Sequence, residues 1–216
     1  MNEQRIPLNH SVLDLQSDGD NAINDWFSFS NSVTTIRICL EDSAHHGLAA
    51  ALIVHDAQLA LTDGDSVHLD ARLLEVGGVD IDGREGAAAA TDLHIPRMPR
   101  GAHTASAAAK ANSDLSASAR LSLNGDAAVV LAGVAPHPIR ARQIESAVRG
   151  RQLSDRVIDL AAQTARSEAQ PYGVGDLTDP TAVDNVEDAV RRLFRRLRDR
   201  FDEAQPHDRR HPPRRR

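Results

Sequence analysis

The sequence is poor in the residues that several common chemistries require. Its 216 residues include one cysteine, Cys39, which excludes an internal disulfide and a cysteine-based zinc or iron–sulfur site. Aromatic residues make up 3% of the chain, so the core must be built mainly from Ala, Leu and Val. No run approaches the ~18 apolar residues of a membrane span, and the N-terminus MNEQRIPLNH lacks the features of a signal peptide. These absences predict a cytoplasmic protein without a membrane segment.

The positive charge of the chain is almost entirely arginine. Lys110 is the single lysine, and the formal net charge is -6. A negative chain makes nucleic acid an improbable main partner, because affinity for phosphate requires clustered positive charge. The basic residues gather in RRLFRRLRDR at 191–200 and in the tail that ends RRHPPRRR. We interpret them as the solvated face of an amphipathic helix; docking onto an acidic partner and binding of nucleic acid remain the alternatives.

Motifs for nucleotide binding and hydrolysis are absent as well. The sequence contains neither G-x-x-x-x-G-K-[ST] nor G-x-G-x-x-G, and no G-x-S-x-G nucleophile turn. Four histidines, His45, His46, His55 and His68, lie close together in sequence but lack the spacing of a helical zinc site. We therefore assign no catalytic residue and no metal ligand.

The first half of the chain gives weak periodic signals. Residues 1–30 show no sustained hydrophobic period and are rich in Asn, Asp and Ser, which predicts a poorly ordered segment. A helical segment carries Leu48, Ala51 and Leu52 on one face and leads into a strand at 57–61. Pro96 and Pro99 then favour extended geometry and predict a division of the chain near residue 100.

The second half is clearer. A polar–apolar alternation at 113–123, the turn signal Asn124-Gly125-Asp126 and an apolar run at 127–134 predict a hairpin. Helical patterns follow at 138–148, at 154–169 with Ser154 as N-cap, and from about residue 184 to 201. The tail, residues 205–216, lacks large apolar side chains and is expected to be disordered. The second half is thus α+β, a small antiparallel sheet packed by three helices.

The order of these segments resembles a known family. The stretch IPRMP is followed by KANSD, by LAGVAPHPIRA, by the helical ESAVRG and by AAQTARSEAQP. Over residues 92 to about 203 this series resembles the C-terminal domain of the FAD-binding (medium) subunit of molybdenum hydroxylases, the xanthine dehydrogenase and carbon monoxide dehydrogenase group. A second stretch, VTTIRICLEDSAHHGLAAALIVHDAQLAL, is similar to the family's segment TIGGNLCxxSPAADLxxALLALDAEVxL.

The resemblance implies a division of the chain and a cofactor. Residues 31–100 would form a partial α/β FAD-binding-type subdomain, and residues 101–204 the flavoprotein C-terminal domain. FAD would lie between them, and the residues that correspond to the cofactor-binding positions are Thr34, Thr35, Lys110, Ser113 and Asp114. The family's partners are a molybdopterin large subunit and an iron–sulfur small subunit, from which FAD passes electrons to NAD or another acceptor.

One departure from the family leaves an alternative open. The family's Gly-Gly, which lets the backbone approach the cofactor, is replaced here by Arg37-Ile38. Upstream, residues 1–30 contain nothing like the family's A-G-G-T-D loop. The alternative to a flavoprotein subunit is therefore a divergent or truncated subunit of such a complex that serves docking and binds no FAD.

Overall fold

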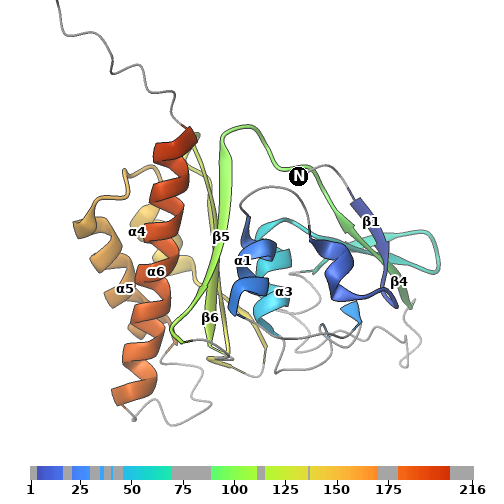
Figure 1. Cartoon of the computed structure of the whole chain (residues 1–216), viewed down its shortest axis with the longest axis horizontal. Helices are drawn as coiled ribbons and strands as arrows, with labels where there is room; N and C mark the ends of the chain where they lie inside the picture. Colours follow the sequence, from blue (N-terminus) through green and yellow to red (C-terminus); the bar gives the residue numbers. More distant parts are fainter. Residues whose placement is uncertain are drawn as a thin grey trace, which may run out of the picture.

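The computed structural model describes most of the chain in two halves (Figure 1). The residues that it describes are 4–16, 21–29, 35–36, 40, 46–69, 89–110, 115–135, 137–169 and 180–204. Within them, no helix is both long and apolar enough to cross a membrane.

The first half contains a four-stranded antiparallel sheet. Its strands are β1 (Gln4–Pro7), β2 (Gln58–Leu61), β3 (Ser66–His68) and β4 (Ala90–Ile95), in the order β1-β4-β2-β3. β2 and β3 form a hairpin, whereas β1 pairs with β4 from the distant end of this half. Because every pairing is antiparallel, the first half is α+β rather than α/β.

Short helices cover one face of this first sheet. They are η1 (Val12–Leu15), α1 (Ala22–Phe29) and α3 (His46–Val54). α1 begins after Asn21, whose Oδ1 accepts hydrogen bonds from the backbone N–H groups of Ile23 and Asn24 at 2.9 and 3.0 Å. All nine residues of α3, HGLAAALIV, are buried. A helix that is apolar all round must lie between two layers.

The second half contains the other antiparallel sheet. Its strands are β5 (Ala102–Ala108), β6 (Ser116–Ser122), β7 (Ala127–Ala132) and β8 (Ile139–Arg140), paired in chain order. The predicted hairpin is present, because Asn124 and Gly125 connect β6 to β7 and Gly125 has φ +92°, as such a turn requires. The α+β fold class predicted from the sequence is confirmed.

Three helices follow and lie on one face of this second sheet. They are α4 (Arg142–Val148), α5 (Asp155–Ala169) and α6 (Pro180–Ala204). Figure 1 shows α6 running along β5, with α4 and α5 beside it. Ser154 caps α5 as predicted, since its Oγ accepts from the N–H of Val157 at 3.4 Å.

The second sheet is shared by two hydrophobic cores. Along β7, Ala128, Val130 and Ala132 face the core formed by α1, α3 and the first sheet. Their neighbours Ala127, Val129 and Leu131 face the core formed with α4, α5 and α6. A strand buried on both faces loses the alternation of polar and apolar residues, which explains the continuous run AAVVLA.

A buried carboxylate joins the N-terminal part of the chain to its last helix. Asp25 of α1 is 8% exposed and lies 2.7 Å from Nη2 of Arg200 in α6. Arg196 Nη1 lies 3.2 Å from the same oxygen, Oδ1, while Oδ2 accepts a hydrogen bond from the N–H of Ser106 in β5 at 2.9 Å. Arg200 also donates to the carbonyl of Thr104. The charge of Asp25 is thus paired and hydrogen-bonded inside the protein.

α3 approaches β6 closely at one glycine. A Cβ atom added to Gly47 would lie 2.9 Å from Oγ of Ser116 in β6 and 3.1 Å from the indole of Trp26 in α1. A Gly inside an otherwise Ala- and Leu-rich helix costs helix propensity. The close approach of three elements explains why the position is glycine.

Two expectations from the sequence differ from the structure. Residues 1–30, expected to be poorly ordered, contain β1, η1 and α1, with Leu8, Ile23 and Trp26 in the core. These elements find their partners far along the chain, so a local periodic pattern does not reveal them. The helix expected at 138–148 begins only at Arg142, because residues 139–140 pair with β7 as β8.

The domain boundaries stay a prediction. The chain passes from the first sheet to the second between Ile95 and Ala102, close to the expected division near residue 100. β1 belongs to the first sheet although it lies within residues 1–30, so the unit expected at 31–100 includes earlier residues in the fold. The tail at 205–216 lies outside the described residues.

Replacing Asp25 tests the connection between α1 and α6. We expect Asp25→Asn to lower the free energy of unfolding by about 3–5 kcal/mol, because it leaves Arg200 buried without a counter-charge. Chemical denaturation followed by circular dichroism measures the change. Arg5→Gln, which removes the exposed ion pair with Asp92, is the control and should cost about 0–1 kcal/mol. Equal costs for the two variants would contradict the inferred role of Asp25.

A larger side chain at Gly47 tests the close approach. Gly47→Leu should destabilise the protein by at least about 1–3 kcal/mol, because no room exists beside Trp26. Trp26→Ala opens space at the same place, so the double variant should lose less stability than the sum of the single variants. Thermal or chemical unfolding of the four proteins measures this coupling. Strict additivity would show that Gly47 and Trp26 do not compete for the same space.

Candidate functional site

The hairpin loop between β5 and β6 carries three of the five predicted cofactor-binding residues. Lys110 follows β5 and is exposed, so its ammonium group is free to meet a ligand from solvent. Ser113 and Asp114 lie outside the described residues. The chain re-enters the described part just before Ser116, the first residue of β6, which is 1% exposed.

The first turn of α3 reaches the same end of β6. Ser116 pairs with Ala108 of β5 and lies against Gly47 in the first turn of α3. Residues 41–45, which precede α3, lie outside the described residues. Since Ser116 follows the β5–β6 loop and Gly47 lies within the second family-like segment, the fold brings the two segments together. The junction of the two halves is therefore the candidate site.

The remaining predicted residues lie at the start of that second segment. Thr35 is half-buried and forms an isolated antiparallel bridge with Ser11, and the N–H of Ile36 donates to the carbonyl of His10 at 3.0 Å. Thr34, Arg37 and Ile38 lie outside the described residues. The structure thus ties Thr35 to the N-terminal part of the chain, next to η1.

The electrostatic character of the junction suits an anion. The N-terminus of a helix carries partial positive charge from its unpaired N–H groups. α3 presents this end beside Ser116, and the exposed ammonium of Lys110 belongs to the neighbouring loop. A pyrophosphate or another anionic group would be stabilised by both.

An unpaired hydroxyl also points to a ligand at this junction. Ser116 Oγ is buried and has no hydrogen-bond partner among the described residues. A buried hydroxyl without a partner costs about 1–3 kcal/mol, so such a group usually meets a ligand, a water or a nearby polar chain. With the exposed ammonium of Lys110 in the neighbouring loop, it is the polar group of the described residues that an anionic cofactor such as FAD would meet here.

The sequence motifs did not reveal Gly47, Ser116 or Trp26 as residues of the junction. The available signal was the glycine in HGLAAALIV, since an isolated Gly in an apolar helix often marks close approach of another backbone. Ser116 stands in the regular alternation of β6 and gives no signal of its own.

The histidines take structural positions in the described part of the chain. His55 follows α3, is buried, and pairs through Nε2 with Thr104 Oγ1 at 3.1 Å. Burial, with Arg120 and Arg200 nearby, lowers the pKa of His55 to about 3, so the ring is neutral. No group of three or more His, Cys, Asp or Glu side chains is arranged for a metal among the described residues.

Comparison with known proteins connects this fold to a family. Residues 97–180 match the family described as CO dehydrogenase flavoprotein C-terminal domain. This segment includes β5 to β8, α4 and α5, and with them the predicted Lys110 loop. No curated protein sequence matches the chain.

Solved structures share the fold over most of the chain. A chain of Cu,Mo-CO dehydrogenase in its cyanide-inactivated form has a TM-score of 0.64 and 19% identity, covering 82% of this chain and 67% of that one. A CO dehydrogenase chain from Hydrogenophaga pseudoflava gives 0.56 and 20%, covering 74% and 59%. A quinoline 2-oxidoreductase chain from Pseudomonas putida 86 gives 0.58 and 15%, covering 78% and 61%.

These identities are low enough that the structural likeness shows the fold alone, and the chain spans about two thirds or less of each of those three chains. The family match is independent of that likeness and rests on sequence. It falls on the segment in which the motifs IPRMP, KANSD and LAGVAPHPIRA stand. The resemblance to the FAD-binding subunit of molybdenum hydroxylases is thereby confirmed for residues 97–180, which are similar to the CO dehydrogenase flavoprotein C-terminal domain.

Proposed function

We propose that the chain is the flavoprotein subunit of a cytoplasmic oxidoreductase of the molybdenum hydroxylase type. In this role it holds FAD and works with a molybdopterin large subunit and an iron–sulfur small subunit. Electrons pass from the iron–sulfur clusters through FAD to NAD or another acceptor. The observation that carries the proposal is the family match over residues 97–180, which includes the loop at the junction of the two halves.

FAD, when bound, supplies the chemistry of accepting and donating electrons one or two at a time, and the chain supplies its position. Lys110 offers a cation to an anionic part of the cofactor from the β5–β6 loop. The first turn of α3 offers backbone N–H groups and the positive end of the helix dipole. Thr34, Thr35, Ser113 and Asp114 complete the proposed set of binding residues, as the resemblance implies.

The two halves of the fold explain how such a site would be kept rigid. Asp25, Arg200 and Ser106 join α1, α6 and β5 by buried, charge-assisted contacts. Trp26, next to Asp25, contacts the Gly47 position in α3. The same helix α1 therefore fixes α3 on one side and β5 on the other, so the two segments assigned to FAD are held in one geometry.

The flavin content of the purified complex tests the proposal. The full chain is expressed with its molybdopterin and iron–sulfur partners, and FAD is measured by its absorbance and by release on denaturation. We expect FAD in a stoichiometric amount. Lys110→Glu should weaken FAD binding about tenfold or more, because a charge-assisted hydrogen bond contributes about 1.5–3 kcal/mol.

Arg149→Glu is the matched control for Lys110→Glu. It makes the same reversal of charge on an exposed residue, but at the end of α4, near the β6–β7 turn and at the other end of the second sheet. We expect it to leave FAD binding unchanged. A complex that assembles without flavin, or equal effects of the two variants, would overturn the proposed role of the loop.

The alternative, a docking subunit without FAD, is favoured by one sequence feature. Arg37-Ile38 replaces the glycine pair of the family, and a side chain there obstructs a close backbone approach to pyrophosphate. Calorimetry of the parent chain against Arg37→Gly separates the two functions. Tight FAD binding by the parent excludes the docking function, whereas binding that appears only in Arg37→Gly supports it.

A further inference from the structure

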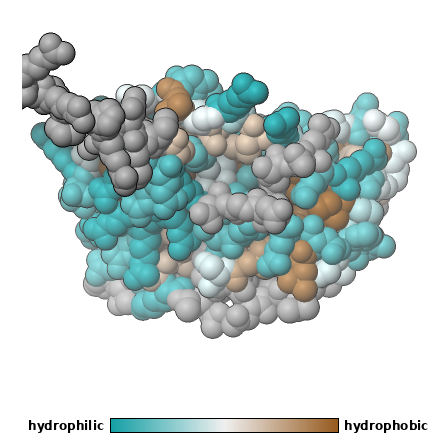
Figure 2. All heavy atoms as spheres, turned by 45° about the horizontal axis from the view of Figure 1, so that its top comes forward, coloured by the Kyte–Doolittle hydropathy of each residue, from teal (hydrophilic) through white to brown (hydrophobic). Residues whose placement is uncertain are grey.

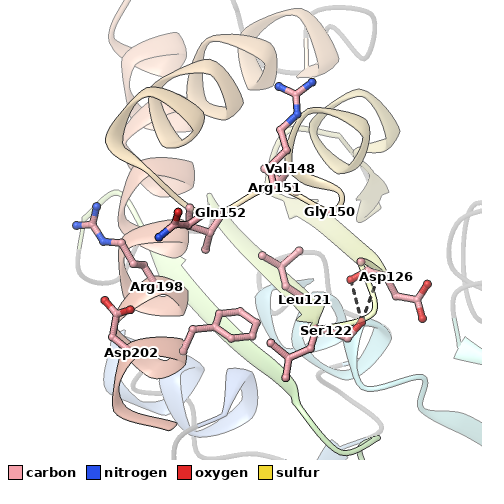
Figure 3. Close-up of a pocket in the computed structure, with 13 residues that line it drawn as sticks. Leu121, Ser122, Asp126, Val148, Gly150, Arg151, Gln152, Arg198 and Asp202 are labelled. Carbon is pink, nitrogen blue, oxygen red and sulfur yellow. Dashed lines mark hydrogen bonds between the residues drawn. The ribbon is translucent and has the colours of Figure 1, made fainter. Parts of the chain in front are cut away.

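A cavity of about 310 Å³ opens at the end of the second sheet opposite to Lys110 (Figure 3). Three segments form it: the β6–β7 turn, the connection from α4 to α5, and the last turns of α6. Apolar side chains from all three segments line it, namely Leu121, Val148, Leu153 and Phe201. It takes no part in the proposed FAD site, since the strand β6 separates the two.

Two glycines shape the rim of this cavity. Gly125 in the β6–β7 turn and Gly150 after α4 have φ values of +92° and +66°. A Cβ atom at Gly125 would lie 3.6 Å from the Cα atom of Gly150, so the two turns touch through their backbones. This contact closes one side of the cavity, and the last turns of α6 form another.

Two of the apolar residues that line the cavity also reach solvent. Leu123 is 76% exposed, the highest value among the large apolar side chains of the described residues. Phe201 is half-buried and stacks edge-on against His103 with ring centroids 4.5 Å apart. Elsewhere the surface in Figure 2 is mostly hydrophilic, with apolar side chains in small separate areas. An exposed leucine and an aromatic ring beside an apolar cavity mark a surface that something covers.

Acidic side chains at the rim of the cavity offer partners to a cationic segment. Asp199, Asp202 and Glu203 are exposed on the last turns of α6, and Asp126 lies on the opposite rim. The C-terminal end of α6 adds partial negative charge. Arg198 is engaged by Asp155 at 2.7 Å. Arg151 also lines the cavity, and its guanidinium extends away from Leu121 in Figure 3.

The sequence directly after α6 has the matching composition. α6 ends at Ala204, one turn after Phe201, and QPHDRRHPPRRR follows. These 12 residues contain five Arg and one Asp, which gives a formal charge of 5 − 1 = +4, and three Pro. Fully extended, they reach about 40 Å, several times the distance back to the cavity mouth.

We propose that this cavity is the docking site for the basic tail of the same chain, residues 205–216. The proline rings and the apolar stems of the arginines cover Leu123 and Phe201, since arginine buries its stem and keeps its charged end in water. The guanidinium groups meet Asp126, Asp202 and Glu203 at the rim. Proline-rich segments dock on aromatic-lined grooves at small entropic cost, because their backbone is already restricted.

Methyl NMR of the full chain and of a variant that ends at Ala204 tests the proposal. The truncation removes no described residue. We expect the methyl signals of Leu121, Leu123 and Leu153 to shift between the two proteins, while those of Leu48 in α3 stay in place. The shifts should be independent of protein concentration and should diminish with added salt.

A synthetic peptide of residues 205–216, added to the truncated protein, should move the same signals back toward their positions in the full chain. In the full chain, Leu123→Ser should weaken docking about tenfold or more, because it removes the apolar side chain that the tail covers. Leu160→Ser, an equally polar change at another exposed leucine on α5, is the control and should have no effect.

Identical methyl spectra of the full and truncated proteins would overturn the proposal. So would shifts that depend on protein concentration, which would show that the tail docks on a second copy. If the spectra agree but Leu123 shifts when a partner subunit is added, the cavity belongs to that partner and the tail does not occupy it. None of these outcomes depends on whether FAD binds at the Lys110 loop.

Discussion

The buried carboxylate of Asp25 is the contact on which the arrangement of the two halves depends. A charge at 8% exposure is tolerated only where opposite charge and N–H donors surround it, and Arg200, Arg196 and the N–H of Ser106 meet this need. The three partners come from α6 and β5, more than 80 residues away in sequence. Formation of this site therefore requires α1, β5 and α6 to be in place together.

The shared second sheet follows from the same constraint. With α6 bound to one face of β5 and α1 to the other, the sheet has no face left for water. Its strands accordingly carry small apolar residues on both sides, as in AAVVLA of β7, and Ala dominates because helices approach from both directions. The low aromatic content of the chain is thus a property of a thin, two-sided core rather than of weak packing.

The sequence predicted those parts whose partners are local. The turn at Asn124-Gly125, the Ser154 cap of α5 and the apolar stripe of α6 from Val186 to Leu197 each depend on residues within a few positions, and all are present. The start of α4 was predicted too early, because residues 139–140 pair with β7 and Glu145 accepts from the N–H of Val129, 16 residues back. The helix α1 was missed since its polar face is satisfied by β5 and α6. The same limit applies to the candidate site. The sequence motif indicated the Lys110 loop, but the contact between Ser116, which follows that loop, and α3 depends on tertiary packing and could not be predicted from local sequence.

The two ends of β6 carry different groups, and the two proposed sites lie at opposite ends of this one strand. At Ser116 a helix N-terminus and the loop of Lys110 present positive charge, which favours an anionic cofactor. At Leu121 the carboxylates of Asp126 and Asp202 lie at the rim of the cavity together with Arg151 and with Arg198, which is paired with Asp155. The strand is seven residues long, so the two ends lie about 20 Å apart and beyond the Debye length at physiological salt. Charge changes at one end of β6 therefore act only weakly on the other end. The proline-containing segment VAPHPIR, between β7 and α4, belongs to the scaffold that supports both ends.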